Sequence, residues 1–343
     1  MTAVPVRLGE QSYEVLVAQD LLREAGRHCR FDRKVMIVTD DGVPEAYARY
    51  VAASCASPFI HTFRAGEQSK TFETLQSVLS HMLRENFTRT DCVVAVGGGV
   101  AGDLAGLAAS LYMRGVDFYN IPTTVLAQVD SAVGGKTAVD LEGAKNVVGT
   151  FYQPKKVLID PAVLSTLPPR QVANGLAEAV KIAATCDETL FAFIENALRE
   201  GSLAASLEHV ITESVRLKAA VVEKDEKESG LRRVLNFGHT LGHAVEACAG
   251  FGKLLHGECV AVGMLPLCSE SAADRLRPVL TALSLPTSVS VDPESVFAFL
   301  AHDKKADGDT VTAVFVDKIG SFRFEKLPLA DMKPYIARLS GKS

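Results

Sequence analysis

Three histidines between residues 236 and 258 form the first group in this sequence whose types and spacing could do chemistry. His239 and His243 are four residues apart, so a helix would place both imidazoles on one face, one turn apart. His256 follows a glycine-containing turn and stands two residues before Glu258. Neutral imidazole is the commonest metal ligand, and a catalytic zinc ion typically has three protein ligands and an open position. The spacing predicts a metal site; the alternative is a helix cap and core histidines.

A carboxylate that could complete this metal site lies in an apolar helical segment, residues 170–185. Glu178 and Lys181 are three residues apart there, on one face of the helix, within GLAEAVKIAA. A buried carboxylate is costly without a cation or a metal, so Glu178 is the best candidate for the missing ligand. The alternative is an internal ion pair between Glu178 and Lys181.

A glycine run at residues 97–99 is the second candidate binding site. A buried apolar strand leads into this run, and an alanine-rich helix leaves from about residue 100. Glycine lets the backbone approach a ligand closely, and a helix N-terminus favours phosphate. We expect a pyrophosphate there, with Asp103 as a further polar contact; a tight strand-to-helix turn is the alternative. The GxGxxG spacing is a weak signal by itself, since Asp117 falls at the start of the next predicted strand.

The elements that must position these groups alternate between strand and helix up to about residue 125. This alternation predicts a mostly parallel sheet covered on both faces. Ligands of such sheets bind beyond the carboxyl ends of the strands. The polar and glycine residues that fall at such ends are Asp40, Glu67, Lys70, Gly98, Gly99, Thr123 and Thr124.

The glycine-rich segment 127–154 carries Asp130, Lys136, Lys145 and Asn146 among small residues. Its valine, alanine, phenylalanine and tyrosine neighbours predict a packed loop whose lysines face a polar ligand. Lysine is a point charge that suits phosphate or carboxylate.

Helical periodicity dominates from Pro168 onward, with a β-hairpin at residues 310–326 as the expected exception. We therefore expect an α/β N-terminal domain with a mostly parallel, Rossmann-like sheet, residues 1–165, as the nucleotide-binding part. A mainly α-helical C-terminal domain, residues 166–343, is expected to bind metal and substrate. A chain of 343 residues suits two domains.

Composition excludes several classes of protein. The net charge of -5 offers no basic surface for nucleic acid, and no apolar segment approaches the length of a membrane span. The N-terminus lacks the pattern of a signal peptide. Seven cysteines without a CxxC pair indicate reduced thiols. The sequence predicts a cytoplasmic protein without a nucleic-acid or membrane partner.

Taken together, a set of motifs between residues 35 and 305 resembles the 3-dehydroquinate synthase family. These motifs are GEQSKT, GGGVAGDLAG, YMRGV, PTTVLAQVDSAVGGKT, AKNVVGTFYQP, GLAEAVKIA, DEKESGLRRVLNFGHTLGHAVE and LLHGECVAVGM. The resemblance implies NAD and one divalent metal, zinc or cobalt, as cofactors. It implies a phosphorylated sugar acid, 3-deoxy-D-arabino-heptulosonate 7-phosphate, as the substrate. The implied steps are transient oxidation by NAD, elimination of phosphate, re-reduction and an intramolecular aldol closure.

The resemblance also implies roles for single residues. It makes Glu178, His239 and His256 the metal ligands and leaves His243 outside the metal sphere. The residues that it places around the phosphate and hydroxyls of the substrate are Lys136, Asn146, Lys181, Arg232, Asn236, His243 and Lys304. At the last of these, Lys305 is the alternative.

Further roles follow from the same resemblance. Asp130 and Lys218 match positions that contact the reacting end of the sugar. Arg114 matches an arginine that the neighbouring subunit supplies, which implies a homodimer. The expected NAD contacts are Lys136, Lys145 and Thr166, together with Asp103 and the residues predicted above at the carboxyl ends of the strands: Asp40, Glu67, Lys70, Gly98, Gly99, Thr123 and Thr124.

Three rivals stay open. The first is a metal- and NAD-dependent polyol or alcohol dehydrogenase of the glycerol dehydrogenase type. The cluster of lysines and arginines argues against it, because an uncharged alcohol would leave those charges unpaired. The second rival is another sugar phosphate cyclase, and the intact GGKT and LNFGH segments favour the dehydroquinate enzyme over it. The third is a scaffold without activity, which the complete set of motifs disfavours.

Overall fold

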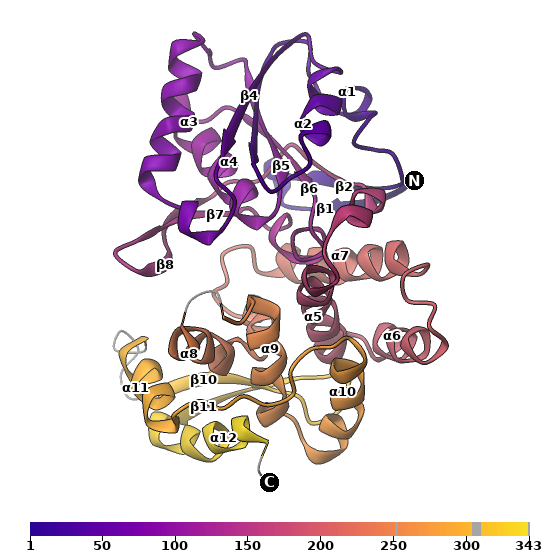
Figure 1. Ribbon diagram of the computed structural model, residues 1–343, viewed down its shortest axis with the longest axis vertical. Helices are drawn as coiled ribbons and strands as arrows, with labels where there is room; N and C mark the ends of the chain where they lie inside the picture. The colour runs from indigo at the N-terminus through magenta and orange to yellow at the C-terminus, as the bar shows by residue number, and fades with distance from the viewer. Residues whose placement is uncertain (251–252, 304–309, 342–343) are drawn as a thin grey trace. The chain divides into compact units, whose positions relative to one another are not determined.

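The computed structural model describes residues 1–250, 253–303 and 310–341. The chain divides into two compact units (Figure 1). Unit 1 comprises Met1–Pro168 and Lys218–Lys227, and unit 2 comprises Pro169–Leu217 and Glu228–Ser343. The division differs from the expected one at residues 218–227, which include the end of helix α7 (Leu207–Lys224) and belong to unit 1.

A seven-stranded sheet in the order β1-β2-β9-β6-β5-β3-β4 forms the centre of unit 1. Its strands are β1 (Thr2–Val6), β2 (Tyr13–Val17), β3 (Lys34–Asp40), β4 (Ser57–Phe63), β5 (Cys92–Gly97), β6 (Asp117–Pro122) and β9 (Lys156–Ile159). Neighbouring strands pair in parallel, except for β1 and β2, which pair antiparallel. Every residue of β5 is buried, as expected of a strand covered on both faces. The expected mostly parallel, Rossmann-like sheet is confirmed.

The helices of unit 1 lie on both sides of this sheet (Figure 1). Besides the end of α7, they are α1 (Ala25–His28), α2 (Glu45–Ala52), α3 (Phe72–Arg84) and α4 (Gly99–Leu111). Helices α3 and α4 pack on the face that presents Met36 and Val38 of β3 and Val93 and Ala95 of β5. This buried apolar cluster holds the first turn of α4 at the carboxyl end of β5.

Residues 127–154 are not the packed loop that the sequence suggested. They form a π-helical turn (Ala127–Ser131) and an antiparallel hairpin of β7 (Lys136–Leu141) and β8 (Ala144–Phe151). Glu142 and Gly143 connect the strands with φ of 49° and 83°, the positive pair that a two-residue hairpin turn needs. Strand β8 is mostly exposed, whereas residues 137–139 of its partner β7 are buried.

Unit 2 is mainly helical. It contains α5 (Pro169–Cys186), α6 (Glu188–Glu200), the first part of α7, α8 (His239–Ala249), α9 (His256–Met264), α10 (Glu270–Ala282), α11 (Pro293–Asp303) and α12 (Lys333–Ala337). The expected hairpin is present as β10 (Thr310–Phe315) and β11 (Arg323–Pro328). The α/β part followed by a mainly helical part is therefore confirmed.

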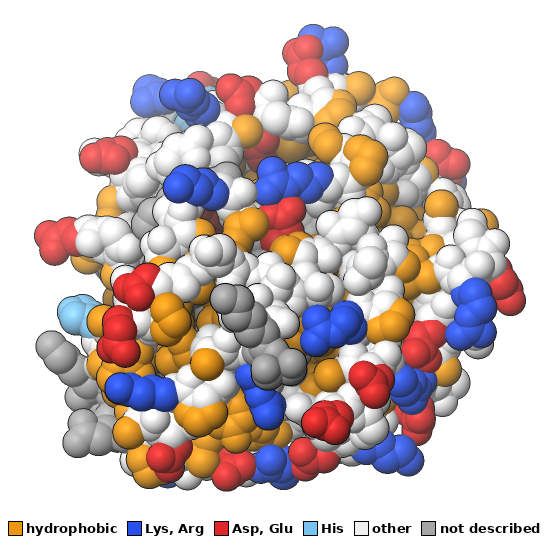
Figure 2. Space-filling model, turned by 60° about the horizontal axis from the view of Figure 1, so that its bottom comes forward, with side chains coloured by type: hydrophobic (Ala, Val, Ile, Leu, Met, Phe, Trp, Pro, Cys, Tyr) orange, Lys and Arg blue, Asp and Glu red, His pale blue; other side chains and the backbone are white. Residues whose placement is uncertain are grey.

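Charges of both signs are interspersed on the face shown in Figure 2, rather than gathered in one field. Within the described ranges, the helices are too short or too polar to span a lipid bilayer.

Candidate metal and dinucleotide sites

Helices α5, α8 and α9 of unit 2 bring the predicted metal ligands together. Glu178 Oε1 lies 3.7 Å from His239 Nε2 and 3.4 Å from His256 Nε2. Zinc ligands at about 2.0–2.2 Å in a tetrahedral arrangement stand roughly 3.3–3.6 Å apart. The observed separations fit the coordination of one divalent cation by these three side chains.

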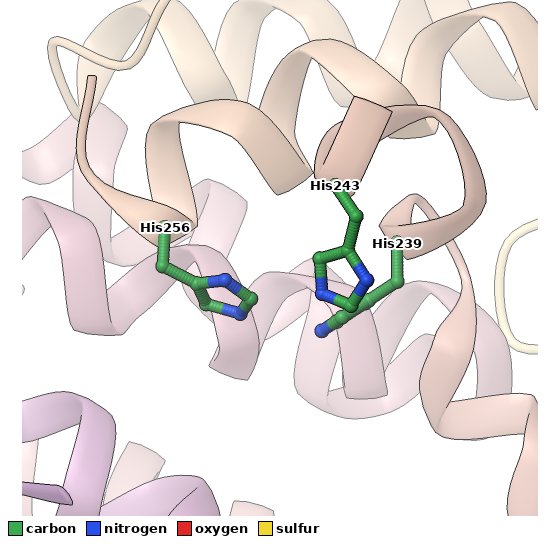
Figure 3. A group of neighbouring side chains, drawn as sticks. All are labelled: His239, His243 and His256. Carbon is green, nitrogen blue, oxygen red and sulfur yellow. The ribbon is translucent and has the colours of Figure 1, made fainter. Parts of the chain in front are cut away.

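His243 adds a third imidazole to the same group. Ligand nitrogens of His239, His243 and His256 lie within 4.8 Å of one another, and Figure 3 shows the three rings gathered in one space. His243 is exposed, whereas the other two histidines are partly buried. Two donor sets are thus available: the three histidines, or Glu178 with His239 and His256.

Glu178 distinguishes between these two sets. Its carboxylate is 1% exposed, and among the described residues neither oxygen accepts a hydrogen bond of regular geometry. Burial raises the pKa of Glu178, but the Lys181 ammonium and the protonated His256 ring outweigh burial and hold that pKa well below its ordinary value, so the carboxyl is ionised. The Lys181 ammonium pairs with Oε2, which leaves Oε1 turned toward the imidazoles. A buried anion whose neighbours are a lysine ammonium and two imidazoles is a suitable ligand for a cation, which favours the set that contains Glu178.

The surroundings of the two histidines suit metal binding. His239 Nδ1 lies 3.2 Å from the Phe237 carbonyl oxygen, so Nδ1–H can donate there while Nε2 keeps its lone pair. Burial and the nearby Lys181 ammonium hold the pKa of His239 well below its ordinary value, so this ring is neutral. His256 Nδ1 lies 3.7 Å from Glu246 Oε2, a carboxylate that the sequence analysis missed. Burial lowers the pKa of His256, but Glu178 and Glu246 raise it to about 9, so a bound cation would displace a proton there.

The other predicted residues of unit 2 lead directly into α8. Arg232 is buried and Asn236 partly buried, on a 3-10 helix that spans Leu231–Asn236. Asn236 Nδ2 donates to Glu228 Oε1 over 2.7 Å. Lys304 and its alternative Lys305 lie outside the described residues.

In unit 1, the glycine run at residues 97–99 lies where strands β3, β5 and β6 end. A Cβ added to Gly97 would lie 3.5 Å from Asp40 Oδ2, one on Gly98 would lie 3.3 Å from Thr124 Cγ2, and one on Gly99 would lie 3.2 Å from Ser131 Oγ. Gly98 precedes the first turn of α4, so free backbone N–H groups gather there. A Cβ on Gly97 would also lie 2.6 Å from Ala101 Cβ, so this glycine lets the strand pack closely on α4. The N–H groups at the start of α4 fit a pyrophosphate.

Three polar residues meet next to this run. Lys70 is 4% exposed, and its ammonium pairs with the carboxylate of Asp103 and with Asn146 Oδ1. Burial raises the pKa of Asp103 to about 6, although Lys70 lowers it. The β7–β8 hairpin brings Asn146 here, since Asp140 N donates to the Lys70 carbonyl over 2.8 Å and Asn146 N donates to Asp140 Oδ1 over 2.8 Å.

Asp130 and Lys218 are also brought together. Lys218 Nζ lies 2.5 Å from both the carbonyl oxygen and Oδ1 of Asp130, and the lysine is 4% exposed. This contact lies within unit 1 because residues 218–227 belong to it.

The remaining predicted residues of unit 1 occupy strand ends and turns. Glu67 begins the 3-10 helix Glu67–Ser69, which follows β4, and Thr123 follows β6. Lys136 and Lys145 lie on β7 and β8. The hydroxyl of Thr166 lies 3.0 Å from Tyr47 Oη. Arg114 is exposed and has a φ of 68°.

Comparison with known proteins decides the family. A family profile described as 3-dehydroquinate synthase N-terminal matches residues 60–174, and one described as 3-dehydroquinate synthase C-terminal matches residues 175–306. The chain belongs to the 3-dehydroquinate synthase family. A 3-dehydroquinate synthase of Enterococcus faecalis is 40% identical over 353 residues, which cover 98% of this chain and 99% of the relative.

Solved structures of other cyclases resemble this member of the 3-dehydroquinate synthase family. A 2-deoxy-scyllo-inosose synthase in complex with carbaglucose-6-phosphate, NAD⁺ and Co²⁺ is 29% identical, with a TM-score of 0.88 over 98% of this chain and 99% of that one. A 2-epi-5-epi-valiolone synthase from Streptomyces hygroscopicus subsp. jinggangensis, with NAD⁺ and Zn²⁺ bound, is 30% identical, with a TM-score of 0.87 over 97% of this chain and 98% of that one. A probable glycerol dehydrogenase from Sinorhizobium meliloti, at 15% identity and a TM-score of 0.63, shares the fold alone.

Proposed function

We propose that this protein is a 3-dehydroquinate synthase, which converts 3-deoxy-D-arabino-heptulosonate 7-phosphate to 3-dehydroquinate and phosphate. The observation that carries the proposal is the group of Glu178, His239 and His256 in a chain 40% identical, over nearly its full length, to a 3-dehydroquinate synthase. The identity to cyclases with other products is lower, at 29% and 30%.

The cofactors that we propose are NAD and one divalent cation, zinc or cobalt. Two similar cyclases hold NAD⁺ together with Co²⁺ or Zn²⁺. When bound, NAD accepts and returns a hydride, and the cation polarises the oxygens of the substrate. Glu178, His239 and His256 would hold the cation, while Gly98 and Gly99 at the start of α4 would accommodate the pyrophosphate.

The cationic side chains of unit 2 would bind the phosphate of the substrate. Lys181 and Arg232 are each 2% exposed. Such desolvated cations interact more strongly with an anionic substrate group than with a neutral polyol. The same phosphate is the leaving group, so its binding both orients the substrate and stabilises the charge that develops on departure. We assign Asn236, His243, Lys136, Asn146 and Lys304 to the substrate as well, and Asp130 with Lys218 to its reacting end.

One assay separates this reaction from that of a dehydrogenase. Purified protein receives zinc, the heptulosonate phosphate and NAD in catalytic amount. We expect phosphate release without accumulation of NADH, because the hydride returns to the substrate in each turnover. NADH formed in proportion to turnover would assign the protein to the dehydrogenases. Turnover of another heptulose phosphate, with none of the heptulosonate, would assign it to another cyclase.

We also propose that the enzyme is a cytoplasmic homodimer in which Arg114 reaches the site of the second copy. Arg114 follows two exposed apolar residues, Leu111 at 49% and Met113 at 42%. Phe151, exposed at 42%, lies next to them in the fold, since Thr150 Oγ1 donates to Ser110 Oγ over 3.0 Å. Apolar side chains grouped around an exposed arginine suit an interface between copies. None of the seven cysteines, which all lie in the described parts of the chain, forms a disulfide bond, and this suits a reducing compartment.

A further inference from the structure

Helix α5 contacts the start of α9 at successive turns. Arg170, Asn174 and Glu178 are four residues apart and share one face of α5. Asn174 Oδ1 accepts a hydrogen bond of 2.6 Å from the backbone N–H of Gly257, the residue after His256. The contact lies one turn from Glu178 on α5 and one residue from His256 on α9.

The backbones of the two helices touch at this point. A Cβ added to Gly257 would lie 2.0 Å from the carbonyl oxygen of Asn174 and 2.8 Å from its carbonyl carbon. Any side chain there would force the helices apart. The buried N–H of Gly257 belongs to the first turn of α9, where no intrahelical acceptor exists, so Asn174 supplies the acceptor that this position requires.

Arg170 holds the same helix start from the preceding turn of α5. Its Nε donates to Glu258 Oε1 over 2.7 Å, and its Nη2 donates to Glu258 Oε2 over 2.8 Å. The Glu258 carboxylate in turn accepts from the N–H of Leu255 over 2.8 Å. Paired hydrogen bonds of this kind fix both distance and orientation. Three successive positions on one face of α5 therefore contact Glu258, Gly257 and His256.

We propose that Asn174 and Arg170 are positioning residues of the metal site: they fix the distance between Glu178 and His256, and thereby the affinity for the cation. The proposal rests on the ligand set proposed above. Neither residue belongs to the proposed ligand set. Each acts by holding the backbone on which His256 stands, and a shift of a few tenths of an ångström there changes the 3.4 Å separation between Glu178 Oε1 and His256 Nε2.

The test measures the affinity of the full-length, metal-free protein for Co²⁺, from the visible absorption of the bound ion, without NAD or substrate. Asn174→Ala removes the acceptor and should weaken Co²⁺ binding by about 10- to 100-fold, the range for residues that orient ligands. Asn174→Asp keeps an oxygen at the helix start and should stay within about threefold of the wild type. Arg170→Ala, at an arginine whose side chain is 57% exposed, should weaken binding about tenfold without preventing folding.

A control variant separates positioning from general loss of stability. Asp187→Ala removes the acceptor for the N–H groups of Thr189 and Leu190 at the start of α6, in the same unit. It should lower the melting temperature about as much as Asn174→Ala but leave the Co²⁺ affinity unchanged. Unchanged affinity in both Asn174→Ala and Arg170→Ala, or equal weakening in Asp187→Ala, overturns the proposal. Unchanged Co²⁺ affinity in Glu178→Ala would overturn the ligand set as well. Absence of turnover in the wild type and in every variant would contradict the proposed reaction but not the positioning of the metal ligands.

Discussion

Glu178 Oε1 lies 3.4 Å from His256 Nε2, while Lys181 pairs with the other oxygen of the same carboxylate. The two interpretations that the sequence left open, an ion pair and a metal ligand, are therefore compatible. One oxygen serves the lysine, and the other faces the imidazoles. The carboxylate thus has a partner in the metal-free protein and still offers a donor atom to a cation.

Replacing Glu178 by glutamine should remove most of the metal affinity. The amide keeps the shape of the side chain but loses the charge that attracts the cation. We expect Co²⁺ binding to weaken by more than about 100-fold, beyond the range for residues that only orient ligands, and phosphate release to fall with it. Glu213→Gln, which breaks a surface ion pair with Arg216 in the same unit, is the matched control. Full turnover at full metal occupancy in Glu178→Gln would contradict the ligand assignment.

Removing Lys181 should destabilise the metal-free protein more than the metal-bound one. Lys181→Met leaves the Glu178 carboxylate buried at 1% exposure without its ammonium partner. Loss of one member of a buried ion pair costs about 3–5 kcal/mol. A bound cation would replace part of the missing charge. Zinc should therefore raise the melting temperature of Lys181→Met by more than it raises that of the wild type. Calorimetry with and without zinc measures this difference; an equal shift in both proteins would show that the cation does not sit next to Glu178.

Gly98→Ala should weaken NAD binding without unfolding unit 1. The φ of Gly98 is -77°, which alanine adopts freely, and its new Cβ would meet Thr124 Cγ2 at 3.3 Å, a contact that a small shift relieves. The added methyl group would instead occupy space at the start of α4, where we expect the pyrophosphate. Calorimetric titration should give an NAD affinity at least about tenfold lower, since about 1.4 kcal/mol of lost contact suffices for that factor. An unchanged affinity would place the pyrophosphate elsewhere.

The sequence predicted the parts of the site that depend on local pattern. A strand that ends in three glycines and a charged pair in an apolar helix are visible within one stretch of chain. Asn174 and Glu246 escaped notice because their roles depend on Gly257 and His256, which other elements carry. The contact between Lys70 and Asn146 was missed for the same reason, since it requires the β7–β8 hairpin. Glu142 and Gly143, a turn pair between two apolar runs, were the signal that could have revealed this hairpin.

A histidine pair away from the metal site should make unit 1 sensitive to acid. Nδ1 of His61 on β4 lies 3.2 Å from Nδ1 of His81 on α3, and His61 Nε2 lies 3.1 Å from Ser77 Oγ. Burial, together with His81 and Arg84, lowers the pKa of His61 from 6.5. The unfolded chain therefore binds more protons than the native one below about pH 6.5, and the native state loses stability as the pH falls through the lowered pKa.

His61→Gln should flatten this decline, because glutamine keeps hydrogen-bonding groups but does not titrate. The measurement is the melting temperature between pH 7.5 and 5, for the wild type, His61→Gln and, as a control in the same unit, His28→Gln. We expect the melting temperature to fall less on acidification in His61→Gln than in the wild type, and to fall as much in His28→Gln as in the wild type. A loss identical to that of the wild type would mean that His61 takes up as many protons in the native as in the unfolded chain over this range, so that folding does not lower its pKa.

Arg114 allows a test of the proposed homodimer by complementation. Arg114→Ala and Glu178→Ala should each be inactive alone. In a mixed dimer, the site that keeps Glu178 would receive an intact Arg114 from its neighbour, while the other site would lack both groups. Random pairing of equal amounts gives half mixed dimers with one working site each, so co-expression should recover about a quarter of wild-type activity. No recovery, in dimers shown to be mixed by two different affinity tags, would mean that Arg114 serves the site of its own chain.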